Sequence, residues 1–352
     1  MTALADIMKA RIARAGPMTI ADYMAECLMH PEHGYYATRD PFGSDGDFIT
    51  APEISQMFGE LIGLCLAQTW IDQGSPSRIC LAELGPGRGT LMADILRATK
   101  AVPGFHAAAE VHLVETSPHL KTLQAQAIPN ATWHDDISTL PDAPLFLVAN
   151  EFFDALPIRQ FIRDRDGWRE RMIGVEDDAL TIGLSAPAPI ALLEHRLDDT
   201  KDGDLVEVCL ALPATVQEIG NRLSASGGAA LIIDYGDWAS LGDTLQALRG
   251  HDHTHPLAAS GQADLTAHVD FAEIARAAPP TKFTRVTPQG VFLERLGITQ
   301  RAQSLATQLD GDALASHIAA HRRLTHPDEM GRLFKVIGLY PATANPPPGL
   351  DP

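Results

Sequence analysis

The apolar positions divide the chain into short apolar runs and longer segments with helical spacing, a pattern typical of an α/β protein. The run at 145–149 is apolar throughout, which indicates a strand buried on both faces of a parallel sheet. Five strands are predicted for the central sheet, at 79–84, 111–115, 131–133, 145–149 and 229–236. We therefore expect a doubly wound α/β fold with helices on both faces.

Further elements are predicted around this sheet. In chain order they are a helix within 2–15, a helix capped by Thr19, a long helix from Glu53 to Ile71, an antiparallel hairpin over 158–173, a helix from Pro213 to Leu223, a strand at 244–249, a helix opened by 264–271 and a sheet edge at 334–339. The pattern divides the chain into an N-terminal helical cap with a lid loop (1–75), the first part of the core (76–154), an insertion (155–226), the rest of the core (227–342) and a disordered proline-rich tail (343–352).

Charge and composition restrict the partners. The 352 residues carry a formal net charge of −18, which repels phosphate backbones, so we expect no nucleic-acid partner and favour a basic protein or a small cation. No apolar run is long enough to cross a bilayer, and we expect no stable membrane insertion. The chain opens without an export-signal pattern, so we expect a cytoplasmic protein in a bacterium, or a matrix protein in a mitochondrion. Four cysteines without C-x-x-C pairing are expected to be reduced thiols.

The strand at 79–84 leads into a glycine-rich turn and then a helix. The residues Glu83-Leu84-Gly85-Pro86-Gly87-Arg88-Gly89-Thr90 form an E-x-G-x-G-x-G motif, whereas a nicotinamide fingerprint is G-x-G-x-x-G. Glycines allow a ligand to lie against bare backbone, and Thr90 or the preceding turn is expected to cap the helix. The carboxylate of Glu83 favours a cation over a pyrophosphate. We therefore predict that Glu83, Gly85, Gly87, Gly89 and Thr90 bind S-adenosylmethionine, whose methionine part carries an ammonium.

Two further strand ends supply candidate cofactor contacts. Glu115 ends the second strand, where its carboxylate can accept both hydroxyls of a ribose; the alternative is a solvated strand end. After the third strand, an acid followed by an apolar residue can bind an adenine amine and pack against the ring. The candidates are Asp135 or Asp136, which the sequence does not separate, together with Ile137.

The fourth strand runs into Asn150-Glu151-Phe152-Phe153-Asp154. We expect these residues to lie over the sulfonium, with the side-chain carbonyl of Asn150 and the carboxylates of Glu151 and Asp154 available to a guanidinium or ammonium group. The two phenylalanines can shield the transfer from water. The alternative is a helix start in which Asn150 is the N-cap.

Three other segments have weaker chemical signals. The acids of 264–271 are expected to be helix caps, and the alternative is that this cluster lines the substrate cleft. The loop at 43–50 is rich in glycine and aspartate but also carries aromatic residues, so Asp47 and Thr50 are candidates for a lid over the cofactor; the alternative is an ordinary surface loop. His251, His253 and His255 alternate, which is compatible with a metal site. Because methyl transfer needs no metal and only Asp252 is a nearby carboxylate, we expect none.

These motifs together resemble the MidA family over about residues 16–340. The matching segments are 46–53, the Glu83–Thr90 loop, 150–157, Asp234-Tyr235-Gly236 and 264–271. The resemblance implies a class I (Rossmann-like) S-adenosylmethionine-dependent methyltransferase with an N-terminal helical cap and an antiparallel β insertion. Mitochondrial members are respiratory complex I assembly factors described as protein arginine methyltransferases. It further implies symmetric dimethylation of an arginine on the complex I subunit homologous to the 49-kDa protein.

For an arginine acceptor, the position of Glu151 and Asp154 after the fourth strand leads us to expect that they anchor the guanidinium and that either can accept its proton. Two other functions remain open at this stage. One is a small-molecule methyltransferase of the same fold, and the other is an assembly chaperone that binds the cofactor without turnover. The sequence does not indicate an oligomeric state.

Overall fold

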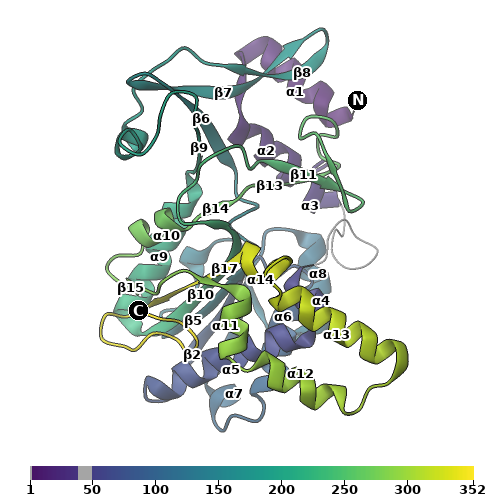
Figure 1. Cartoon of the computed structure of the whole chain (residues 1–352), viewed down its shortest axis with the longest axis vertical. Helices are drawn as coiled ribbons and strands as arrows, with labels where there is room; N and C mark the ends of the chain where they lie inside the picture. The colour runs from purple at the N-terminus through teal and green to yellow at the C-terminus, as the bar shows by residue number, and fades with distance from the viewer. Residues whose placement is uncertain (1, 39–49) are drawn as a thin grey trace.

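The computed structural model describes residues 2–38 and 50–352 and has two lobes stacked along its long axis (Figure 1). The lower lobe is built around a central sheet, and the upper lobe consists of helices and smaller sheets. Among the described residues, no helix is long and apolar enough to span a membrane.

The central sheet is that of a doubly wound fold. Its strands, from edge to edge, are β4 (Thr132–His134), β3 (Ala109–Val114), β2 (Ile79–Leu84), β5 (Leu145–Asn150), β10 (Gly228–Asp237), β17 (Phe334–Tyr340) and β15 (Lys282–Phe283). Two short strands, β14 (Val269–Asp270) and β16 (Thr287–Pro288), pair with β10 and β17. The first five are parallel, whereas β17 is antiparallel to β10. The five predicted core strands are confirmed to within two residues.

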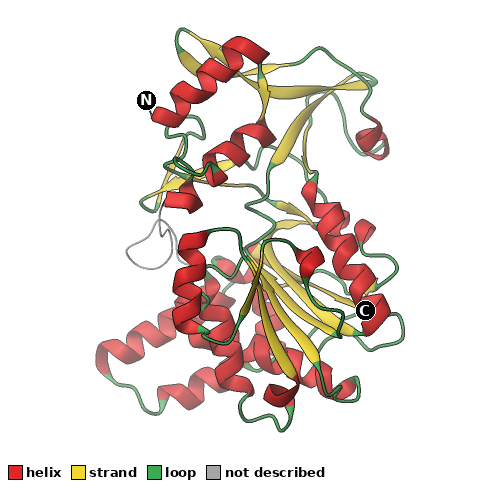
Figure 2. Ribbon diagram, turned by 180° about the vertical axis from the view of Figure 1, so that it is seen from behind, coloured by secondary structure: helices red, strands yellow, loops and turns green. Residues whose placement is uncertain are grey.

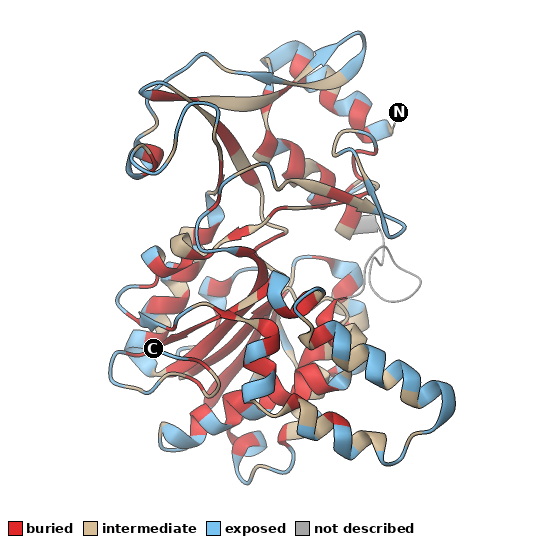
Figure 3. Cartoon of the chain, in the orientation of Figure 1, coloured by how far each residue is buried: buried red, intermediate tan, exposed pale blue. Residues whose placement is uncertain are grey.

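Alternate residues of each strand enter opposite layers of the core. In β2, Ile79 and Leu81 pack into one hydrophobic cluster, whereas Cys80 and Ala82 pack into the other. Helices cover both faces (Figure 2), and the strands are buried along almost their whole length (Figure 3). The first face carries α5 (Gln56–Asp72), α6 (Thr90–Thr99), α7 (Phe105–Ala108), α11 (Gln289–Arg295), α12 (Ile298–Ala306), α13 (Gly311–Thr325) and α14 (Met330–Leu333). The second face carries η1 (Ile137–Thr139), α9 (Ala211–Ser226) and α10 (Phe271–Ala277).

The upper lobe gathers three segments that are far apart in the sequence. A shared cluster joins α1 (Ala3–Ala15), α2 (Ile20–Met29) and α3 (Tyr35–Thr38) to residues of the predicted hairpin and of the segment 247–267. The lobe's strands are β1 (Met18–Thr19), β6 (Ile158–Asp164), β7 (Gly167–Glu176), β8 (Ala179–Leu184), β9 (Leu205–Cys209), β11 (Gln246–Arg249), β12 (Asp252–Thr254) and β13 (Asp264–Thr266), and η2 (Ala191–Arg196) lies beside them. The hairpin is confirmed, because β6 and β7 pair antiparallel.

Local capping chemistry fixes several helix starts. Thr19 accepts from the Asp22 amide, and Asp22 accepts from the Thr19 amide, so the predicted cap is a capping box. Ser117 caps α8 (Pro118–Ala127). The long helix predicted from Glu53 is two helices, α4 (Ala51–Ile54) and α5, because Ser55 is extended and its hydroxyl caps α5. The predicted helix at 264–271 is also corrected: β13 and β14 come first, and Asp270 caps α10.

The boundaries expected from the sequence differ from the structure in two places. The helix α5 belongs to the core rather than to the N-terminal cap, because Met57, Phe58 and Ile62 pack into the core cluster. The helix α9 also belongs to the core rather than to the insertion, since Val216 and Ile219 cover the opposite face of the sheet.

The C-terminal segment differs from its expected form as well. The strand β17 is not an edge, because it lies between β10 and β15. The tail expected to be disordered is packed against the lower lobe: Leu350 is 6% exposed within the core cluster, and Arg295 donates to the carbonyl of Gly349 at 3.1 Å. Apolar burial and hydrogen bonds to the tail backbone, including that of the Arg285 amide to the Asp351 carbonyl at 2.8 Å, thus order a segment whose composition is typical of disorder.

Candidate active site

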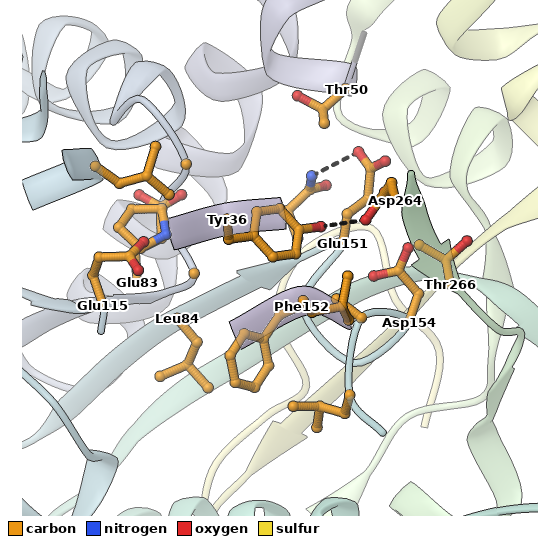
Figure 4. Close-up of a pocket in the computed structure, with 18 of the residues that line it drawn as sticks. Tyr36, Thr50, Glu83, Leu84, Glu115, Glu151, Phe152, Asp154, Asp264 and Thr266 are labelled. Atoms are coloured by element: carbon orange, nitrogen blue, oxygen red, sulfur yellow. Dashed lines mark hydrogen bonds between the residues drawn. The ribbon is translucent and has the colours of Figure 1, made fainter. Parts of the chain in front are cut away.

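A cavity of about 600 Å³ lies at the carboxyl ends of β2, β3, β5 and β10, where it is also lined by residues of the upper lobe. Consecutive strands run to opposite sides of β2, so the cavity is at the point where the strand order reverses. Ligands of open α/β sheets bind at such a point. Figure 4 shows its lining, with Glu83 and Glu115 at one end and Glu151, Asp154 and Asp264 at the other.

The glycine-rich loop forms one wall of this cavity. Gly85, Gly87 and Gly89 have φ angles of 58°, 52° and 85°, a region that L side chains rarely adopt. A Cβ on Gly85 would lie 2.9 Å from Cδ2 of Phe152, so the backbone there approaches the opposite wall closely. The residue that caps α6 is Gly89, and Thr90 instead donates its hydroxyl hydrogen to Glu53 Oε1 at 2.5 Å.

The environment of Glu83 favours the binding of a cation. Its side chain is 3% exposed, and within the described residues its Oε2 atom has no hydrogen-bond partner. Burial raises the pKa of Glu83 to about 8, and the amide of Met92 offsets only part of this effect. An ammonium group placed here would ionise the carboxyl and satisfy its oxygen atom.

Glu115 is held by a network that the sequence did not reveal. Its Oε1 accepts from the Ser117 amide at 2.8 Å, and its Oε2 accepts from Gln124 Nε2 at 3.2 Å. The buried Gln124 also donates to the carbonyl of Gly87 at 2.8 Å, and it accepts from Trp133 Nε1 at 2.8 Å. Gln124 therefore joins the glycine loop to the candidate ribose acid; its helical position alone carried no signal of this role.

Both candidate adenine acids line the cavity, as does Ile137. Asp135 forms an ion pair with Lys121 at 2.5 Å and has an 80% exposed side chain. Asp136 instead accepts from the Ser138 amide at 2.8 Å and so caps η1. Ile137 is buried against the second core cluster.

The other end of the cavity is acidic. Asn150 ends β5, and its Nδ2 donates to Glu151 Oε1 at 3.0 Å; the Asn150 Oδ1 atom, on an 8% exposed residue, has no partner in the described structure. Glu151 has a φ angle of 51°, so it belongs to a strained turn rather than to the helix start considered above. Burial raises the pKa of Glu151 to about 7. For Asp154, burial and the charge of Glu151 raise the pKa to about 7.

Asp234 holds this turn in place through hydrogen bonds to its backbone. It is fully buried in β10, and its Oδ2 accepts from the amides of Phe153 and Asp154 at 3.0 and 3.3 Å, while its Oδ1 accepts from the Tyr235 amide at 2.9 Å. The sequence shows an acid at the end of an apolar strand, but it does not indicate that this carboxylate binds the backbone of the turn. Tyr36, Tyr235, Asp264, Thr266 and His268 also line the cavity. Tyr36 was missed as a site residue, whereas the acids of 264–271 were expected either to cap a helix or to line the substrate cleft.

The remaining candidates divide between the cavity and the surface. Thr50 is buried and lines the cavity beside α4, whereas Asp47 lies outside the described residues. His251, His253 and His255 are exposed around β12, and no group of three or more metal-ligating side chains is found in residues 2–38 and 50–352.

The lining fits S-adenosylmethionine. Two buried oxygens without partners, Glu83 Oε2 and Asn150 Oδ1, lie on residues of a cavity within the usual size range for such ligands. The strand order with an antiparallel β17, the glycine loop and the acidic strand ends define a class I S-adenosylmethionine-dependent methyltransferase.

Comparison with known proteins identifies the family. Residues 61–288 match the model of a family described as putative S-adenosyl-L-methionine-dependent methyltransferases, and the chain belongs to this family. The mitochondrial protein arginine methyltransferase NDUFAF7 of Bos taurus is 37% identical over 94% of this chain and 82% of its own. The corresponding protein of Xenopus laevis is 35% identical over 94% and 83%.

A solved structure has the same architecture. A COG1565 superfamily member from Burkholderia thailandensis, bound to S-adenosyl-homocysteine, superimposes with a TM-score of 0.81 at 28% identity, covering 99% of this chain and 93% of that one. The expected fold, enzyme class and cofactor are therefore confirmed. The protein is an S-adenosylmethionine-dependent methyltransferase.

Proposed function

We propose that the methyl acceptor is an arginine side chain of another protein. The supporting observation is the charge of the cavity. Its described lining includes one arginine, Arg88 of the glycine loop, and eight carboxylates: Glu53, Glu83, Glu115, Asp135, Asp136, Glu151, Asp154 and Asp264. Such an excess attracts a cationic acceptor and repels an anionic one. The relatives named protein arginine methyltransferases support the guanidinium in particular.

The cofactor half of the cavity is assigned in the same proposal. Glu83 holds the ammonium, Glu115 the ribose hydroxyls, and Asp135 or Asp136 with Ile137 the adenine, while Gly85, Gly87, Gly89 and Thr90 form the wall. Thr50 closes the cavity from α4.

In the acceptor half, the turn after β5 carries the chemistry. When bound, S-adenosylmethionine supplies an electrophilic methyl group whose sulfur leaves with the bonding electrons. Glu151 and Asp154 bind the guanidinium and orient one nitrogen, and Asn150 keeps Glu151 in place through the 3.0 Å hydrogen bond. The proton lost from the attacked nitrogen passes to Glu151 or Asp154, whose pKa values of about 7 suit a proton acceptor near neutral pH.

The family resemblance makes the complex I subunit homologous to the 49-kDa protein the first candidate substrate. By the same reasoning, we place the protein in the cytoplasm of a bacterium or in the matrix of a mitochondrion. The relatives compared above are both named as mitochondrial.

The test measures transfer of labelled methyl from S-adenosylmethionine to this subunit, followed by amino-acid analysis of the product. Wild-type protein should give methylarginine, and Glu151→Gln and Asp154→Asn should each lower kcat/KM at least tenfold, about 1.4 kcal/mol, with affinity for S-adenosylhomocysteine unchanged. Asp166→Asn, in the exposed β6–β7 turn, is the matched control.

Three results would contradict the proposal. They are label only in small molecules, stable binding of the subunit without transfer, or unchanged turnover in both variants. The first favours a small-molecule enzyme and the second an assembly chaperone.

A further inference from the structure

Two residues of the upper lobe reach the acidic end of the cavity. Tyr36 lies in α3 and Asp264 begins β13, so 228 positions separate them in the sequence, yet the Tyr36 hydroxyl donates to Asp264 Oδ1 at 2.9 Å. Both residues line the cavity, and Figure 4 shows the Asp264 carboxylate beside those of Glu151 and Asp154. The lower lobe thus supplies two of the three carboxylates, and the upper lobe supplies the third.

The pair is anchored on both sides. The carbonyl of Tyr36 accepts from the Ser117 hydroxyl at 3.1 Å, and the amide of the same serine binds the candidate ribose acid Glu115. Asp264 is 5% exposed and lies opposite Leu248 in the pairing of β13 with β11. Their chain neighbours Tyr35 and Leu265 are buried in the same upper-lobe cluster. The geometry of the pair is therefore set by the fold rather than by a flexible side chain.

The electrostatics of the acidic end of the cavity favour the binding of a cation. The groups that act on one another here include the carboxyls of Glu151, Asp154, Asp234 and Asp264 and the phenols of Tyr36 and Tyr235. The guanidinium of Arg323 also acts on Glu151, but it offsets only part of the effect of burial. Burial and the charges of Asp264 and Asp154 raise the pKa of Tyr36 well above its ordinary value, so its hydroxyl remains a hydrogen-bond donor. Several buried carboxyls at one site stay ionised together only when a positive group joins them.

We propose that Asp264 binds the cationic group of the methyl acceptor and that Tyr36 is the positioning residue that holds its carboxylate for this contact. The lower lobe then holds the cofactor and supplies two of the carboxylates that bind the acceptor, and the upper lobe supplies the third. The inference rests on the proposed transfer to a cationic acceptor and adds the residues that recognise it. A guanidinium suits the site because its planar fork can donate to more than one carboxylate at once.

The test uses the intact protein saturated with S-adenosylhomocysteine and two isosteric probes, cationic methylguanidine and neutral methylurea. Ligand-observed NMR titration gives the affinity of each probe. Wild-type protein should prefer methylguanidine at least tenfold. Asp264→Asn should reduce this preference at least threefold, because the carboxylates of Glu151 and Asp154 remain, and Tyr36→Phe, which keeps the ring, should reduce it by a smaller factor. Asp252→Asn, an exposed position of the neighbouring β12, is the matched control and should retain it.

Affinity for S-adenosylhomocysteine should stay within twofold in every variant, which shows that the protein is folded. The ratio between the probes is informative because a general structural defect weakens both of them equally. An unchanged ratio in Asp264→Asn, or no preference in the wild type, would overturn the inference. Tighter binding of methylammonium than of methylguanidine, with Asp264→Asn losing both, would contradict arginine as the acceptor while supporting the role of Asp264.

Discussion

The Asp234 carboxylate lies 3.0 Å from the backbone nitrogen of Phe153 and so fixes the turn that carries Glu151 and Asp154. A buried acid outside the described lining of the cavity thereby controls where two candidate catalytic carboxylates point. Its hydrogen bonds are to main-chain amides, so the geometry does not depend on the side chains of the turn.

Replacing Asp234 by Asn should therefore lower turnover without weakening cofactor binding. The new amide group faces backbone N–H donors, which costs about 1–3 kcal/mol of unfolding free energy and lets the turn relax. We expect kcat to fall at least tenfold while affinity for S-adenosylhomocysteine stays within twofold. Asp237→Asn, at the exposed end of the same strand, should behave as wild type. Equal turnover in both variants would contradict this role.

Cofactor binding should release a proton from Glu83. In the free protein, burial raises the pKa of this carboxyl to about 8, whereas the ammonium of the cofactor binds the ionised form. Affinity for S-adenosylhomocysteine should therefore increase by up to about tenfold per pH unit as the pH rises toward 8, and then level off. Calorimetry at pH 7 in two buffers of different ionisation enthalpy counts the protons released. Glu83→Gln should bind weakly and show no such release; equal pH dependence in wild type and variant would refute the assignment.

Ligand-free protein should become more stable on mild acidification. The folded-state pKa values of Glu151 and Asp154 are about 7, well above those of an unfolded chain near 4. Between these values the native state binds more protons, so the unfolding free energy falls as the pH rises from about 4.5 to 7. Urea denaturation across this range measures the slope. The double variant Glu151→Gln, Asp154→Asn should reduce this slope without removing it, because the raised pKa values of Glu83 and Asp234 contribute in the same direction. A slope equal to that of the wild type would be evidence against raised pKa values at this turn.

A side chain on Gly87 should block the cofactor. Its φ angle is 52°, and it lines the cavity. We expect Gly87→Val to bind S-adenosylhomocysteine at least tenfold more weakly in calorimetry. Gly74→Val is the matched control, because Gly74 has a φ angle of 86° and a Cβ there would meet no atom within 4 Å. Both variants should lose about 1–2 kcal/mol of stability from backbone strain. Equal loss of binding in both would mean that strain, not steric exclusion, is the cause.

The sequence predicted the features that depend on short stretches of chain. Apolar runs located the core strands, and the motif around Gly85–Gly89 located the cofactor end, because a strand, a turn and a helix start are encoded by neighbouring residues. Tyr36 and Gln124 were not assigned, and Asp264 was not separated from a helix cap, because each acquires its role from a partner distant in the sequence or on another element. Composition was misleading for the tail, because its prolines are typical of disorder, whereas Leu350 and hydrogen bonds to the tail backbone attach it to the lower lobe.

The interior position of β17 has a consequence for biosynthesis. Six residues of β10 pair with this strand, which is encoded only at 334–340. While the ribosome still holds that segment, one side of β10 is an open strand edge, and open edges recruit other polypeptides. A premature stop codon shortly before β17 therefore produces an aggregation-prone fragment rather than a shortened enzyme, even though every residue of the candidate acceptor site has already been translated.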